Sequence, residues 1–191
     1  MPDCLNPVRK ILAAARFAAD RHAAQRRKGR TAEPYVNHLL EVAELLARTA
    51  DDLDTNLIVA ALLHDTIEDV GVTREELAQR FGEDVASLVA EVTDDKSLPK
   101  ETRKALQVER APEKSPRAQA LSAADKIANV RSIVTSPPAN WTFERRVEYV
   151  RWARQVVGRY SQLSGRLAAE FQQASAELQE WEKSGGTKDF F

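Results

Sequence analysis

Apolar residues recur along this chain at the three- and four-residue spacing of amphipathic helices, whereas the alternating pattern of strands is scarce. Residues 38–49 show the helical spacing clearly. The stretch that begins at residue 54 or 55 is apolar on nearly all sides, which is typical of a central helix. The pattern predicts an all-α protein.

Capping residues and helix breakers give the expected boundaries. Asn6 and Pro7 can start a first helix, because the missing N–H of proline has no partner at the first helical position. Asn37 can cap the second helix, and Thr73 with Glu76 forms a capping box for the fourth. We expect helices over about 7–26, 38–49, 55–70, 73–82, 84–93, 100–110, 116–134 and 142–160, and a last one that ends near 183.

Length and composition restrict the class of protein. The 191 residues, 43% hydrophobic and 30% charged, favour a folded chain, which we expect to form one domain over 1–183 before a disordered tail over 184–191. The net charge of -1 argues against bulk nucleic-acid binding, and no apolar run reaches the roughly 18 residues of a membrane helix. Cys4 has no partner in the chain, and no signal peptide is evident, which favours a cytoplasmic protein.

The densest chemistry lies at residues 64–69 (HDTIED), directly after the apolar run 57–63. A buried ionised group destabilises a fold unless it is paired or bound to a metal. On a helix, His64 and Glu68 share one face, and Asp65 and Asp69 share another about 100° away. His64 and Asp65 can therefore reach one ion only near the end of their helix, and Gly71 marks such an end.

Two further candidate ligands come from distant segments. His38 opens the second helix, and Asp125 lies on an apolar helix with Asn129 four residues further on, on the same face. Together with His64 and Asp65 they give two imidazoles and two carboxylates, a set that suits Mn²⁺, Fe²⁺ or Zn²⁺ better than Ca²⁺. A water bound to such an ion loses its proton more easily and becomes a nucleophile.

The order of these residues resembles the HD superfamily of metal-dependent phosphohydrolases. Longer strings resemble the hydrolase domain of the RelA/SpoT-type alarmone enzymes, and the string 94–100 (DDKSLPK) is similar to the stand-alone small alarmone hydrolases. The resemblance covers roughly residues 7–160. The matching strings are RK at 27–28, PYVNH at 34–38, ALLHDTIED at 61–69, FG at 81–82, EVTDDK at 91–96 and ADK at 124–126, with Asn129 and Arg131.

The resemblance implies a single-domain, HD-type helical bundle with a metal site between helices. It also implies an activity, the removal of pyrophosphate from the 3′ position of guanosine tetra- or pentaphosphate, (p)ppGpp, with Mn²⁺. By position, the metal ligands are His38, His64, Asp65 and Asp125, and the residues that handle the attacking water are Glu68 and Asp69. The expected substrate contacts are Arg27, Lys28, Lys100, Asn129, Arg131 and Tyr149. The expected partner is thus a small nucleotide, not a nucleic acid or a membrane.

Each of these assignments has a simpler alternative. Glu68 and Asp69 could form a solvated acidic helix end, and Asp125 could pair with Lys126. The basic residues 26–30 could form a solvated loop. The functional alternatives are a phosphatase for another nucleotide, such as the 2′ phosphate of NADPH, a non-catalytic nucleotide sensor, and an all-helical interaction module.

The role of one further group of basic residues is left open by the sequence. A second basic run, formed by Lys96, Lys100 and Arg103, could contact phosphate or solvent equally well. His22, on the first helix, is interpreted as a structural or supporting residue and not as a ligand. The oligomeric state has no signal in the sequence.

Overall fold

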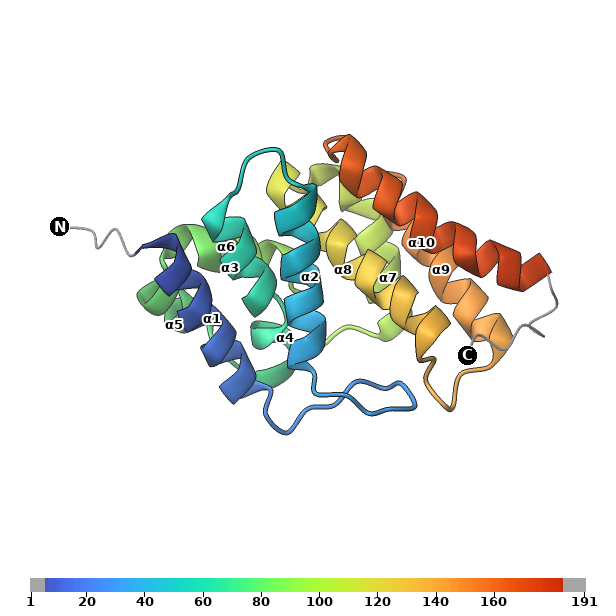
Figure 1. Cartoon of the computed structure of the whole chain (residues 1–191), viewed down its shortest axis with the longest axis horizontal. Coiled ribbons are helices and arrows are strands. Elements are labelled where there is room, and N and C mark those ends of the chain that lie inside the picture. The colour runs from blue at the N-terminus through green and yellow to red at the C-terminus, as the bar shows by residue number, and fades with distance from the viewer. Residues whose placement is uncertain (1–5, 184–191) are drawn as a thin grey trace.

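The structure is a computed structural model that describes residues 6–183, with the side chains of residues 6–176. Within this range it contains helices, one 3₁₀ turn and two isolated bridges but no strand, so the expected all-α class is confirmed. The expected tail over 184–191 lies outside the described residues. The helices (Figure 1) are α1 (Pro7–Arg21), α2 (Val36–Thr49), α3 (Thr55–Leu63), α4 (Thr66–Val70), α5 (Arg74–Phe81), α6 (Glu83–Val92), α7 (Lys100–Glu109), α8 (Pro116–Thr135), α9 (Phe143–Val157) and α10 (Gly165–Lys183), with the 3₁₀ turn η1 (Ala111–Glu113) before α8.

Side-chain caps fix several helix starts where the sequence places them. The first backbone N–H groups of a helix have no partner inside it, so a side-chain oxygen just before the helix can accept from them. Helices α1, α3, α5, α8 and α9 all begin in this way. Their caps are Asn6, Asp54, Thr73, Ser115 and Thr142.

Helix α3 forms the centre of the core, as its apolar sequence predicts. Residues 58–63 are buried, and α3 packs against α1, α2 and α6. Burying a leucine such as Leu62 or Leu63 contributes roughly 1.5–3 kcal/mol to folding. Helix α8 packs against the other side of α2, with α9 and α10 beyond it (Figure 1). No helix in the described part of the chain is long and apolar enough to cross a membrane.

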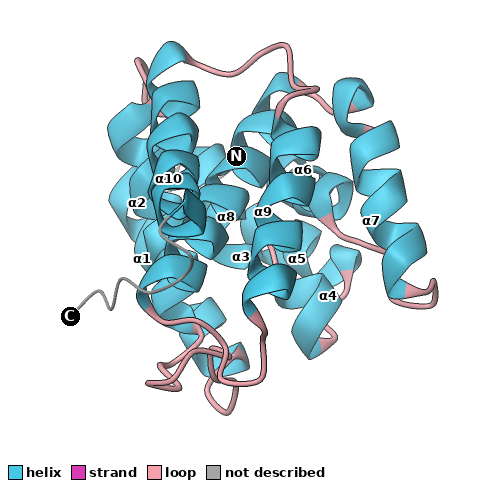
Figure 2. Cartoon of the chain, turned by 90° about the vertical axis from the view of Figure 1, so that its right-hand side faces the viewer, coloured by secondary structure: helices cyan, strands magenta, loops and turns pink. Residues whose placement is uncertain are grey.

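The loops 22–35 and 136–142 lie side by side at one end of the bundle (Figures 1 and 2). The backbone of Gly29 pairs with Pro138 in an isolated bridge. A Cβ atom at Gly29 would lie only 2.5 Å from the backbone oxygen of Ser136, so this close approach requires glycine. The contact brings the basic residues 27–28 beside the end of α8.

The first two helices have boundaries that differ from the expected ones. Helix α1 stops before residue 26, because His22 caps its end and the N–H of Arg27 donates to the carbonyl of Glu33 at 2.9 Å. Helix α2 begins at Val36, so Asn37 lies inside it and is not its cap. Residues 22–35 are thus free to form the wall of a cavity.

The third expected helix is in fact two helices, α3 and α4, with a break at His64 and Asp65. Side chains satisfy carbonyl groups at the break. His64 Nδ1 bonds the carbonyl of Ala61 at 2.8 Å, and Thr66 Oγ1 donates to the carbonyl of Leu63 at 2.6 Å. The break allows the adjacent His64 and Asp65 to face one point, as the sequence analysis requires.

Candidate metal centre

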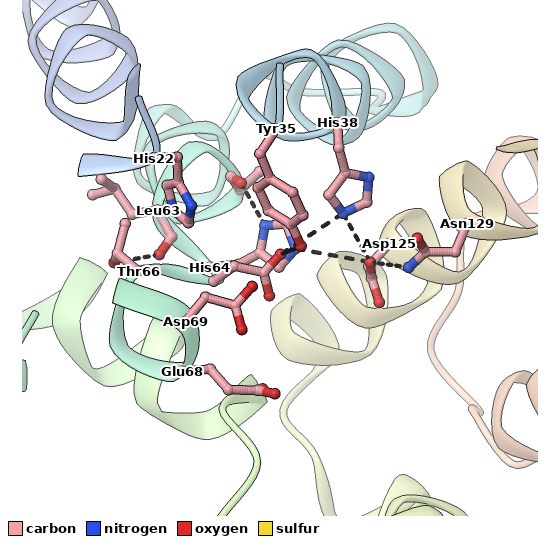
Figure 3. A network of polar contacts seen from close by, with 12 residues as sticks. His22, Tyr35, His38, Leu63, His64, Thr66, Glu68, Asp69, Asp125 and Asn129 are labelled. Carbon is pink, nitrogen blue, oxygen red and sulfur yellow. Dashed lines mark hydrogen bonds and ion pairs between the residues drawn. The ribbon is translucent and has the colours of Figure 1, made fainter. Parts of the chain in front are cut away.

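Four side chains from distant parts of the sequence converge beside the break between α3 and α4 (Figure 3). His38 comes from α2, and Asp125 comes from α8. One ligand atom each from His38, His64 and Asp65 lies within 4.8 Å of the other two. Oδ1 of Asp125 lies 3.2 Å from Nε2 of His38 and 3.8 Å from Nε2 of His64. One cation can therefore be shared by these side chains.

The orientation of His64 suits a metal ligand. Its Nδ1–H donates to the carbonyl of Ala61, which leaves Nε2 as the ring nitrogen that can bind a cation in place of a proton. That Nε2 atom is buried without a hydrogen-bond partner and lies 3.1 Å from Oδ2 of Asp65. Histidines that bind metals commonly donate their other ring proton to a carbonyl or carboxylate. An unpartnered imidazole nitrogen facing carboxylates fits a divalent cation.

Burial and neighbouring charges act in opposite directions on the pKa values at this centre. Burial lowers the pKa of His38, whereas at His64 the carboxylates of Asp65 and Asp125 outweigh burial and raise the pKa well above its usual value. Burial would raise the pKa of both carboxyl groups. The pKa of Asp65 is nevertheless lowered by His64, and that of Asp125 is lowered by Lys126 and the histidines. Both carboxylates are therefore ionised, as metal ligands must be.

Neighbouring side chains fix the two carboxylates in place. The hydroxyl of Tyr35 donates to Oδ2 of Asp65 at 2.7 Å. Nδ2 of Asn129 donates to Oδ1 of Asp125 at 2.6 Å, and Nζ of Lys126 lies 3.1 Å from Oδ2 of the same residue. The pairing of Asp125 with Lys126 that the sequence allowed is thus present, and it leaves Oδ1 turned toward the histidines.

Glu68 and Asp69 lie on α4 beside the converging side chains (Figure 3). Oε2 of Glu68 accepts from the N–H of Asp94 at 3.2 Å, and Oδ2 of Asp69 accepts from Nε2 of Gln25 at 2.7 Å. Nζ of Lys96 lies 2.5 Å from Oδ1 of Asp69 and 3.8 Å from Oε1 of Glu68. Burial raises the pKa of Glu68, which makes it a stronger base than an exposed glutamate.

Two cavities meet at this centre. The inner cavity, of about 190 Å³, is lined by residues that include His64, Asp65, Glu68, Asp125 and Lys126. The outer cavity, of about 350 Å³, is lined by residues that include Arg26, Arg27, Lys28, Asp69 and Trp141. Both share Tyr35, Asn129 and Tyr149 as lining residues. An elongated ligand could therefore place one end at the acidic centre and the other at the basic loop.

The model of the HD domain family matches residues 14–168. The chain belongs to the HD domain family. Together with the cluster of His38, His64 and Asp65, this makes it an HD-domain, metal-dependent hydrolase and confirms the resemblance seen in the sequence.

The relatives of this HD-domain protein include curated enzymes of similar length. It is 47% identical over 161 residues to guanosine-3′,5′-bis(diphosphate) 3′-pyrophosphohydrolase MESH1 of Xenopus tropicalis, covering 82% of this chain and 90% of the relative. It is 48% identical over 148 residues to the Homo sapiens protein of that name, with coverages of 78% and 83%.

Solved structures of similar fold agree with this assignment. One, described as a metazoan ortholog of SpoT that hydrolyses ppGpp and plays a role in starvation responses, is 39% identical with a TM-score of 0.84, covering 92% of this chain and 96% of the other. A second, lmo0812 of Listeria monocytogenes EGD-e, is 28% identical with a TM-score of 0.64, covering 79% and 97%.

Two of the expected substrate contacts do not line either cavity of this HD-domain protein. Arg131 pairs with Glu170 of α10, and Lys100 is exposed at the start of α7. Their role as substrate contacts stays a prediction. The other expected contacts, Arg27, Lys28, Asn129 and Tyr149, all line the outer cavity.

Sequence reasoning missed two residues that support the charged groups of the HD-domain centre. Tyr35 contacts Asp65, and Gln25 contacts Asp69. The support of Asp125 by Lys126 was among the alternatives that the sequence allowed, because the two residues are adjacent. No pattern in the sequence points to Gln25, since its partner is 44 residues away.

Proposed function

We propose that this protein is a manganese-dependent (p)ppGpp 3′-pyrophosphohydrolase, which cleaves ppGpp to GDP and pppGpp to GTP with release of pyrophosphate and so lowers the alarmone. The observation that carries the proposal is the joining of an acidic inner cavity to a basic outer cavity at Asn129 and Tyr149. This shape suits a nucleotide that carries phosphates at both ends of its ribose. Relatives that are 47% and 48% identical bear the name of this activity.

The proposed ligands of the ion are His38, His64, Asp65 and Asp125, whose imidazole and carboxylate groups suit Mn²⁺. When bound, a divalent ion supplies positive charge toward phosphate oxygens and makes a nearby water more acidic. Tyr35 and Asn129 keep the carboxylates oriented toward the ion.

Glu68 is the proposed general base, with Asp69 beside it. The raised pKa of Glu68 suits the removal of a proton from the attacking water. The water oxygen forms a bond to the phosphorus attached to O3′, and the bond between O3′ and that phosphorus breaks. The proton taken by Glu68 is passed on, directly or through solvent, to O3′, so the ribose leaves with a 3′-hydroxyl group and the pyrophosphate carries the oxygen that came from water. Cationic side chains near the cavity stabilise the developing charge.

The remaining contacts position the part of the nucleotide that does not react. Asn129 lies between the two cavities, where the ribose and its 3′ phosphate belong. Arg27 and Lys28 of the outer cavity are the proposed contacts for the base and the 5′ phosphates, and Tyr149 offers an aromatic face to the base. The proposed compartment is the cytoplasm, as the single cysteine suggests.

The test is to incubate the purified protein with Mn²⁺ and separate samples of ppGpp, pppGpp, NADPH and deoxynucleoside triphosphates. The products are identified by anion-exchange chromatography and ³¹P spectroscopy. We expect GDP and pyrophosphate from ppGpp, with no free monophosphate. Turnover of NADPH or a deoxynucleotide but not of ppGpp would replace the proposed substrate. Tight binding of ppGpp without turnover would identify a sensor.

A further inference from the structure

A continuous chain of side-chain contacts links His22 to Asp69. Nδ1 of His22 lies 2.5 Å from Oε1 of Gln25, and Nε2 of Gln25 donates to Oδ2 of Asp69 at 2.7 Å. His22 is 2% exposed and follows the last residue of α1, whereas Asp69 belongs to α4. The chain of contacts therefore reaches from a buried position behind the cavity to a carboxylate on its wall.

The donors and acceptors along this series of side-chain contacts have only one consistent assignment. A carboxylate accepts, so the nitrogen of the Gln25 amide must face Asp69 and its oxygen must face His22. That oxygen can only accept, so His22 must carry its proton on Nδ1. Nε2 of His22 is buried without a hydrogen-bond partner, so no second hydrogen bond of the ring opposes this tautomer. The tautomer of His22 thus fixes the orientation of the Gln25 amide.

The imidazole of His22 is itself fixed by a second contact. It stacks on Tyr35, with ring centroids 5.1 Å apart and planes at 19°, and Figure 3 shows the two rings close to each other. The hydroxyl of Tyr35 donates to Asp65. His22 therefore contacts the supports of two acidic residues, one through a hydrogen bond and one through ring stacking.

We propose that His22 is a positioning residue that acts through Gln25 to hold Asp69 in the orientation needed beside the attacking water. The proposal rests on the proposed function in one respect, the assignment of Asp69 to that water. Without the His22 proton, Oε1 of Gln25 loses its donor, so the amide is free to swing toward another donor and withdraw its nitrogen from Asp69. The carboxylate would then rotate away from Gln25 and remain paired only with Lys96.

Two substitutions separate the hydrogen bond from the stacking. His22→Phe keeps a ring against Tyr35 but removes the donor. His22→Asn removes the ring but keeps a donor, because the side-chain nitrogen of asparagine is as many bonds from Cα as Nδ1 of histidine is. We expect kcat to fall about 10- to 100-fold in His22→Phe with KM little changed, and most of it to return in His22→Asn. A merely structural role for the ring predicts the opposite order.

Gln25→Met removes the amide that contacts Asp69 directly, and it decides the proposal if His22→Phe does not fold. We expect kcat to fall by the same factor as in His22→Phe. The matched control is Ala24→Ser, an exposed neighbour on the same segment, which should keep full activity. Metal content and melting temperature are measured for each variant, so that loss of the ion or of the fold is recognised. Wild-type kcat in both His22→Phe and Gln25→Met would overturn the proposal.

A spectroscopic measurement keeps this proposal separate from the proposed function. The ¹³C resonance of the Asp69 carboxyl group should shift in His22→Phe and return in His22→Asn, whichever nucleotide is the substrate. If ppGpp is not turned over, kcat is measured with the nucleotide that is. If none is turned over, the proposed function fails and the carboxyl resonance alone decides. An unmoved Asp69 resonance in His22→Phe would show that no coupling exists.

Discussion

Arg27 donates from Nη1 to Oδ1 of Asn129 at 3.1 Å, although the two residues are 102 positions apart in the chain. The same amide donates from its nitrogen to Asp125 at 2.6 Å. Because both ends of the Asn129 amide are engaged, its orientation is fixed. The side chain of Asn129 therefore connects the basic loop to Asp125 of the candidate metal centre. A substitution in either part should change the position of the other.

Metal dependence is the first expected property. Exhaustive chelation should abolish turnover, and Mn²⁺ should restore it and raise the melting temperature, because a ligand that binds only the folded state stabilises it. His64→Ala should lose both bound metal and activity, since Nε2 of His64 faces Asp65 at 3.1 Å. Metal content by mass spectrometry and the rate of product formation test this.

The control, Asp51→Asn, changes an exposed carboxylate and should keep both the bound metal and the activity. Full activity in a metal-free sample would contradict the prediction.

The second prediction separates chemistry from metal binding. Glu68 is proposed as a base and not as a ligand, so Glu68→Gln should keep the ion while kcat falls roughly 10²- to 10⁴-fold. The matched control is Glu75→Gln, an exposed position in the first turn of α5, for which no change is expected. Turnover and metal content are measured on the same preparations. If Glu68→Gln loses the ion, Glu68 is a ligand and the assignment is wrong.

Several helix caps could be predicted from sequence because they are local, although the expected cap Asn37 was wrong. Thr73, for example, accepts from an N–H only three residues away. The break at His64 and Asp65 could not be located in this way, because residues 55–70 keep a helical pattern throughout. The break depends on the bonds that His64 and Thr66 make to carbonyl groups of α3, and no periodicity reports such bonds.

The site likewise has a part that the sequence predicts and a part that it does not. The residues of the HDTIED string could be recognised as candidate ligands and bases from their residue types, and their spacing restricts which of them can meet. The residues that hold them in place could not be recognised in this way. Tyr35 reaches Asp65 across 30 residues, and Gln25 reaches Asp69 across 44. These pairs exist only because the loop 22–35 folds over the break between α3 and α4, which is a property of the tertiary structure.

The basic loop gives the third prediction, which concerns the choice of substrate. Lys28 offers a point charge and Arg27 a planar group, and both line the outer cavity with Tyr149. Lys28→Ala should raise KM, mainly for nucleotides with a 5′ diphosphate, and lower kcat/KM about 10- to 100-fold. Arg27→Ala or Tyr149→Ala should weaken discrimination between guanine and adenine. The measurement is kcat/KM for ppGpp and its adenine analogue.

Arg30→Ala is the control for the basic loop, because Arg30 belongs to the same loop but does not line the cavity. It removes the same amount of charge without changing the proposed site. Equal effects from Arg30→Ala and Lys28→Ala would mean that only the general positive charge matters. Unchanged KM and unchanged base preference in all three site variants would identify the loop as a solvated surface.

The fourth prediction is a dependence of stability on pH that arises at Glu170. Its carboxylate pairs with Arg48 of α2 and with Arg131 of α8, and the hydrogen bond from Arg48 is the main cause that lowers its pKa to about 2. A depressed pKa in the folded state means that the contribution is present above the ordinary value for glutamate and is lost as pH falls toward 2. Glu170→Gln should cost roughly 1 kcal/mol at pH 7, since the pairs are partly exposed.

Urea unfolding of wild type and Glu170→Gln at pH 7, 4.5 and 3 tests this dependence. The difference in unfolding free energy between the two proteins should stay constant from pH 7 to about 5 and shrink below that. A difference that is the same at pH 3 as at pH 7 would show that the Glu170 carboxylate contributes by packing and not by charge.

The last prediction decides between two roles of Arg131. As a substrate contact, it should affect KM when it is removed. As the partner of Glu170, 39 residues away, it should affect stability instead, because it joins α8 to α10 and lines neither cavity. The structure favours the second role, so Arg131→Ala should lower the free energy of unfolding by about as much as Glu170→Gln while KM for ppGpp stays within about twofold of wild type. The double variant should be little worse than either single one, since both remove the same pair. A rise of tenfold or more in KM with unchanged stability would return Arg131 to the substrate site.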